Sequence, residues 1–152
     1  MNWLIDMMTN PLLLISLSSW FIAQVLKVFI NAAVNKEWKL ERLFGDGGMP
    51  SGHSATVASL ATASALLYGT GSFQFAVTTI LAIIVCHDAM GVRLETGKQA
   101  IVINEIVESL LDREKQPEVK LKEFVGHTPI QVIIGILIGI LNAAAIYYLF
   151  FA

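Results

Sequence analysis

The C-terminal stretch Ile130–Phe151 reads IQVIIGILIGILNAAAIYYLFF, an apolar run whose main polar interruption is Asn142. A helix needs about 20 predominantly apolar residues to cross the hydrocarbon core of a bilayer. This stretch meets that requirement comfortably. The sequence therefore predicts that a membrane, rather than water, surrounds the folded chain.

Three further apolar stretches precede it, at residues 11–34, 54–68 and 73–90. The second is short and rich in Ala, Ser and Thr, and it is long enough to span only if its polar entrance, residues 50–53, is partly embedded. Gly69–Ser72 predicts a tight turn before the third stretch. We expect a single all-α membrane domain, residues 1–152, in which four transmembrane helices form a bundle at about 11–34, 51–68, 73–90 and 129–151.

Composition agrees with this class of protein. Of 152 residues, 55% are hydrophobic and 14% are charged, whereas soluble domains carry about 25% charged residues. The net charge of −2 and the lack of a basic stripe argue against nucleic-acid binding. The single cysteine, Cys86, excludes an internal disulfide framework.

The basic residues predict the orientation in the membrane. Nine of them follow the first and third apolar stretches: Lys36, Lys39, Arg42, Arg93, Lys98, Arg113, Lys115, Lys120 and Lys122. The N-terminus, the 69–72 turn and the C-terminus carry none. Because basic loops stay in the cytoplasm, we expect a multi-pass cell-membrane protein with both termini outside.

The long segment between the third and fourth stretches is predicted to contain an amphipathic helix at about 94–114. Its apolar residues recur at helical spacing: Ile103, Ile106, Val107, Leu110 and Leu111. Such a helix lies on the cytoplasmic membrane surface or caps a bundle.

Two polar motifs open apolar stretches, and each contains a histidine. Residues 47–54 read GGMPSGHS, and residues 126–131 read GHTPIQ. A helix start exposes unpaired N–H groups and the positive end of the helix dipole, so it favours anions. Both motifs lie on the predicted cytoplasmic side. The sequence thus predicts a phosphate-handling site that contains His53 and His127.

Residues 128–131 have a second interpretation. Thr128 is a good N-cap, Pro129 suits the first helical position, and Gln131 completes a capping box. Gln131 is therefore predicted to act mainly as a cap, and a second role beside His127 is compatible with it.

The two motifs resemble signatures of a known superfamily. Pro50-Ser51-Gly52-His53 resembles the second signature of the type 2 phosphatidic acid phosphatase and vanadium haloperoxidase superfamily. Residues 127–135, HTPIQVIIG, resemble the third, in which His-x-Pro-x-Asp-Val-x-x-Gly is common. Together with DAMGVR at 88–93, they are most similar to its small, divergent, bacterial-type branch, described as acid phosphatase/vanadium-dependent haloperoxidase-related.

The resemblance, which covers about residues 24–139, implies a role for each matching residue. His127 would attack phosphorus and form a phosphohistidine, and His53 would protonate the leaving oxygen. Ser51 and Gly52 would hold phosphate oxygens. Arg93 and Lys27 would supply positive charge, although Lys27 could equally extend to the membrane surface. The resemblance implies no cofactor and no metal.

The chain departs from the superfamily pattern at three places. The Arg-Pro pair of the first motif is replaced by Val34-Asn35, and the arginine six residues before the second histidine is replaced by Leu121. The aspartate that orients the nucleophilic imidazole is replaced by Gln131. A neutral amide holds a tautomer but does not stabilise an imidazolium as a carboxylate does. Asp88 is the candidate for supplying that acid.

These observations predict a membrane lipid-phosphate phosphatase that hydrolyses a phosphomonoester or diphosphate headgroup. One alternative is a non-catalytic protein that binds or translocates lipid phosphates; another is a scaffold whose partner docks on the 94–125 segment. A metal site built from His53, His87, Asp88 and His127 lacks a recognisable ligand spacing.

Small residues form two stripes at helical spacing. They are Gly135, Gly139 and Ala143 in the fourth stretch and Ala55, Ser59 and Ala63 in the second. Such stripes allow close helix packing, either inside a bundle or in a homodimer.

Overall fold

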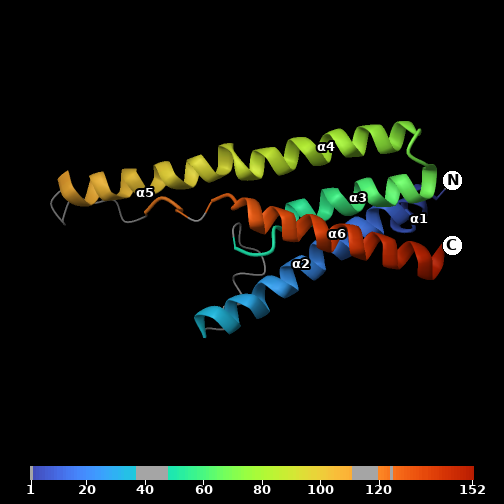
Figure 1. Ribbon diagram of the computed structural model, residues 1–152, viewed down its shortest axis with the longest axis horizontal. Helices are drawn as coiled ribbons and strands as arrows, with labels where there is room; N and C mark the ends of the chain where they lie inside the picture. Colours follow the sequence, from blue (N-terminus) through green and yellow to red (C-terminus); the bar gives the residue numbers. More distant parts are fainter. Residues whose placement is uncertain (1, 37–47, 111–119, 124) are drawn as a thin grey trace.

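The computed structural model describes residues 2–36, 48–110, 120–123 and 125–152, and within these ranges the secondary structure is helical. Figure 1 shows the arrangement of the helices. They are α1 (Trp3–Met8), α2 (Pro11–Asn35), α3 (Gly52–Tyr68), α4 (Phe73–Met90), α5 (Val92–Leu110) and α6 (Pro129–Phe150).

The four main helices begin and end where the local sequence predicts, to within one residue. Side-chain caps explain the starts, because they satisfy backbone N–H groups that have no partner inside a helix. Asn10 accepts hydrogen bonds from the N–H groups of Leu12 and Leu13. Ser51 and Ser72 cap α3 and α4 in the same way. The short helix α1 was not predicted.

Helix α3 occupies the centre of the bundle. It packs against α6, α2 and α4, and most extensively against α6. Its Ala, Ser and Gly residues are buried on several sides. Small side chains let neighbouring backbones approach closely, which explains why this helix is the least hydrophobic of the four and yet the most enclosed.

Among the described residues, three helical stretches are long and apolar enough to cross a membrane: Pro11–Val34, Phe73–Leu110, which contains the predicted span 73–90 and continues through α5, and Pro129–Phe150. Helix α3 has 17 residues, or roughly 25 Å at 1.5 Å per residue, against about 30 Å of hydrocarbon. The all-helical prediction is confirmed, while a fourth full span remains a prediction.

Helix α5 continues in the direction of α4 and projects beyond the rest of the bundle (Figure 1). A helix was predicted here at about 94–114; residues 111–114 lie outside the described part of the chain. Its buried residues are Gly97, Ala100 and Asn104 rather than the predicted apolar stripe. Neither predicted placement, on the membrane surface or capping the bundle, is confirmed.

The buried face of α5 packs against the segment that returns toward α6. Asn104 binds the backbone of Leu121 twice, donating to its carbonyl oxygen at 3.0 Å and accepting from its N–H at 3.1 Å. A Cβ on Gly97 would come within 2.6 Å of the Glu123 carbonyl oxygen. The returning segment therefore runs alongside α5 and brings the start of α6 back to the end of α4.

The two small-residue stripes pack against each other. A Cβ on Gly135 would overlap the Ser51 carbonyl oxygen, and one on Gly139 would overlap that of Ala55. Both stripes are thus used within one chain, and a homodimer would need another surface. The homodimer itself remains a prediction.

The two ends of the bundle differ. The termini and the turn between α3 and α4 lie at one end, and the starts of α3 and α6 lie toward the other (Figure 1). This agrees with the grouping of charged and uncharged segments predicted from the sequence, although Lys39, Arg42, Arg113 and Lys115 lie outside the described residues. Which end faces the cytoplasm remains a prediction.

Candidate active site

Three helix ends meet at the candidate site. The His127 N–H donates to the Ala89 carbonyl oxygen at 3.0 Å, which links the start of α6 to the end of α4. The Ser51 N–H donates to the Gln131 carbonyl oxygen at 3.1 Å, which links the start of α3 to the first turn of α6. These two backbone bonds bring together motifs that are 74 residues apart between His53 and His127.

Gly126 allows the close approach of α6 to the start of α5. Its φ of +90° is a conformation that favours glycine. A Cβ at this position would overlap the backbone of Arg93 and Leu94. The glycine before His127 therefore explains how Arg93, although distant in sequence, reaches the same site.

Both histidines line one small cavity of about 30 Å³. Its walls are His53, Val85, Ala89, Arg93, Val125, Gly126 and His127. Its polar groups are two imidazoles and a guanidinium, a combination that suits a phosphate oxygen. The sequence analysis did not anticipate the apolar walls, because they follow from helix packing rather than from a motif.

Gln131 holds the ring of His127. The Thr128 N–H donates to Gln131 Oε1 at 3.1 Å, which identifies the facing atom as the amide oxygen because a backbone N–H only donates. His127 Nδ1 lies 3.3 Å from the same oxygen. Since the amide oxygen only accepts, Nδ1 carries the proton in this contact. Gln131 thus caps α6 and contacts the His127 ring, while a catalytic orienting role remains a prediction.

His127 is 4% exposed. Burial lowers its pKa below the ordinary value, and electrostatic repulsion from the neighbouring Lys27 and His53 side chains lowers it further. Hydrogen bonds to Gln131 and the Gly48 backbone act in the opposite direction. The balance favours a neutral imidazole, which is the nucleophilic form of histidine.

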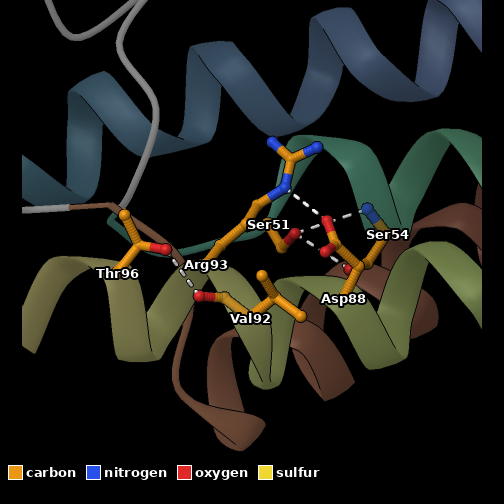
Figure 2. Close-up of polar contacts among 6 residues, drawn as sticks. All are labelled: Ser51, Ser54, Asp88, Val92, Arg93 and Thr96. Carbon is orange, nitrogen blue, oxygen red and sulfur yellow. Dashed lines mark hydrogen bonds and ion pairs between the residues drawn. The ribbon is translucent and has the colours of Figure 1, made fainter.

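Arg93 and Asp88 form an ion pair at the end of α4. Arg93 Nε donates to Asp88 Oδ2 at 2.5 Å, and the terminal guanidinium nitrogens point away from the carboxylate (Figure 2). Asp88 was a candidate for orienting His127. In the structure it is paired with Arg93, and Gln131 occupies the position beside the imidazole.

Ser51 and Gly52 lie in the first turn of α3 but not among the residues that line the cavity. The Ser51 hydroxyl oxygen accepts hydrogen bonds from the Ser54 N–H and hydroxyl at 3.3 and 2.9 Å (Figure 2). A Cβ on Gly52 would come within 3.4 Å of Trp20 and Gln24. Ser51 therefore acts as a buried helix cap in this structure.

Lys27 is 4% exposed, so its side chain stays inside the bundle rather than extending to the membrane surface. Its side chain lies near Gly48 and contributes positive charge at His127. His87 is exposed and does not line the cavity. Among the described residues, no three His, Cys, Asp or Glu side chains gather closely enough to hold a metal ion.

The chain belongs to the Divergent PAP2 family, whose family model matches residues 8–142. It is also similar to a Bacillus subtilis (strain 168) protein named "Uncharacterized membrane protein YuiD". The two are 41% identical over 156 residues, covering 95% of this chain and 99% of the relative. No solved structure gives a significant match.

Proposed function

We propose that this chain is a membrane phosphatase that removes phosphate from a lipid phosphomonoester or diphosphate through a phosphohistidine on His127. The observation that carries the proposal is the shared cavity: His53, His127 and Arg93 line the same small space. Two imidazoles and a fixed cation beside one phosphorus atom are suited to nucleophilic and acid–base catalysis. Membership of the Divergent PAP2 family supports the same class of reaction.

The first step is attack by His127. Nε2 donates its lone pair to phosphorus while Nδ1–H stays bonded to Gln131. The bond between phosphorus and the ester oxygen breaks, and protonated His53 gives its proton to that oxygen. The products are the free alcohol, or the lower phosphate from a diphosphate, and a phosphohistidine.

The second step regenerates the enzyme. Neutral His53 takes a proton from water, whose oxygen attacks phosphorus and displaces His127 Nε2. Inorganic phosphate leaves, and His53 is again protonated. Arg93, the charge of Lys27 and the positive ends of α3 and α6 would stabilise the negative charge that grows on the phosphoryl oxygens.

A second function has one observation in its favour. Gln131 is neutral, so it orients the imidazole without stabilising a positive charge on it. A protein that binds or translocates lipid phosphates needs the anion site but not the chemistry, and this residue is compatible with that function.

The test uses protein purified in detergent micelles and a panel of lipid phosphates. We expect phosphate release that vanadate inhibits, and we expect His127→Ala and His53→Ala each to lower kcat by about 10² or more. His87→Ala is the matched control, because it removes the third histidine without touching the cavity. Binding without release would favour the second function, and full activity of both cavity variants would refute the proposed mechanism.

A further inference from the structure

A second, larger cavity adjoins the histidine cavity. It has a volume of about 380 Å³ and is lined by Leu17, Trp20, His53, Thr56, Val57 and Val85. His53 and Val85 belong to both cavities. The two spaces therefore meet at the imidazole that would protonate the leaving oxygen.

The shared residue His53 indicates which part of the substrate the larger cavity would hold. In the proposed reaction, which this inference extends, the leaving oxygen faces His53 and carries the organic part of the substrate. The apolar residues beyond His53 begin where that organic part would emerge. The larger cavity is thus positioned for the hydrocarbon chain of a phosphate ester.

The larger cavity is an apolar groove on the surface of α3. Its walls come from three helices: Leu17 and Trp20 from α2, Thr56 and Val57 from α3, and Val85 from α4. The Thr56 hydroxyl donates to the Gly52 carbonyl oxygen at 2.8 Å, so its polar hydrogen is already used within the helix. Leu17 is 59% exposed, which leaves the α2 side of the groove open to the surroundings of the bundle.

The size of the groove suits one hydrocarbon chain. A cavity of about 150 Å³ holds benzene, and by the same packing 380 Å³ corresponds to roughly fifteen carbon atoms. We infer that this groove binds a single alkyl or prenyl chain of the phosphate ester that occupies the histidine cavity, with contacts extending over about its first fifteen carbons.

The experiment measures hydrolysis of single-chain alkyl phosphates with 4, 8, 12, 16 and 20 carbons, each over the same range of mole fractions in mixed micelles. We expect KM to fall with each added methylene while the chain fills the groove, by less than the about fourfold of transfer from water, because the micelle already surrounds the chain. The decrease should stop near fifteen carbons. Leu17→Trp places a larger side chain at the open side of the groove. It should reduce, at least tenfold, the KM of the 4-carbon phosphate divided by the KM of the 12-carbon phosphate.

Leu14→Trp is the matched control. Leu14 lies one turn earlier on α2, is 52% exposed and does not line the groove, so this variant should keep the wild-type ratio. An equal change in both variants, or a KM that does not depend on chain length, would overturn the inference.

A second readout separates this inference from the proposed catalysis. Dodecylphosphonate has no ester bond to hydrolyse, and its binding is measured by the rise in the unfolding temperature of the detergent-solubilised protein. Binding that is stronger for dodecyl- than for butylphosphonate and weaker in Leu17→Trp supports the groove even if no substrate is hydrolysed. Catalysis without any such preference leaves the proposed function intact and refutes the groove.

Discussion

At the scale of single residues, Gln131 connects the cap of α6 to the ring of His127. Its amide oxygen accepts from the Thr128 N–H and faces His127 Nδ1 at the same time. One side chain thus caps α6 and favours a proton on Nδ1 of His127. The neutral amide holds the imidazole without adding a charge beside it. A carboxylate at this position should therefore change the pKa of His127.

Replacing Gln131 by Glu should raise the pKa of His127, because a carboxylate beside Nδ1 favours the imidazolium. Glu also preserves the capping box, so stability should change little. Gln131→Met removes the acceptor and should cost about 1 kcal/mol of helix-capping energy. NMR titration of the His127 ring checks the first effect, and an unchanged midpoint in the Glu variant would contradict this account of the site.

The lowered pKa of His127 predicts how stability depends on pH. The unfolded chain has the ordinary pKa of about 6.5, and burial lowers the pKa in the folded protein. At a pH between the folded and the unfolded pKa, the unfolded chain binds more protons at this ring than the folded protein does. The free energy of unfolding therefore rises with pH and falls on acidification. Thermal unfolding between about pH 5 and 7 should show this slope in the wild type.

His127→Asn is the comparison for that measurement, because it removes the titrating ring and should flatten the slope. Lys27→Met should also weaken it, since the lysine charge contributes to the lowered pKa. The same slope in all three proteins would mean that another group is responsible.

At the scale of helices, close packing of α3 on α6 holds the two histidine motifs together. Gly135 and Gly139 leave room on α6 for the backbone of α3, and the Ser51–Gln131 backbone bond fixes the ends of the two helices relative to each other. The geometry of the site therefore depends on Gly135 and Gly139, which lie about two and three turns beyond His127 along α6.

Gly139→Ala should destabilise the protein by about 1–3 kcal/mol, because the added methyl overlaps the Ala55 carbonyl oxygen. Gly71→Ala is the matched control: a Cβ at Gly71 meets nothing within 4 Å. The fraction of protein that remains monodisperse in detergent after heating measures the difference. Equal heat resistance of the two variants would show that the α3–α6 contact is looser than described.

At the scale of the whole molecule, the candidate site lies at the end opposite to the termini and the α3–α4 turn (Figure 1). The positive-inside rule predicts that the end with the site faces the cytoplasm. The structure groups the segments at the two ends of the bundle, and labelling in cells tests which end lies inside.

A cysteine-free background, Cys86→Ala, allows that labelling. We expect Ser72→Cys, in the turn before α4, to react with a membrane-impermeant maleimide in intact cells. Lys120→Cys, in the segment that returns to α6, should react only after the cells are permeabilised. The reverse pattern would invert the predicted topology and place the phosphate site outside.

The sequence alone predicted helices α2 to α6 and singled out His53 and His127 as the candidate site histidines. Apolar runs and caps such as Thr128–Gln131 act over a few residues, so their effect is visible locally. The apolar stripe of α5 did not identify its buried face. The returning segment packs on Gly97 and Asn104, and hydrophobic periodicity does not reveal contacts of this kind with a backbone.

The tertiary structure alone decided which groups share the site. Arg93 reaches His127 because Gly126 permits a close backbone approach, Asp88 pairs with Arg93 rather than with His127, and the apolar groove requires three helices at once. Such pairings depend on distances between helices, which are set by the small side chains packed between them and not by spacing along the chain.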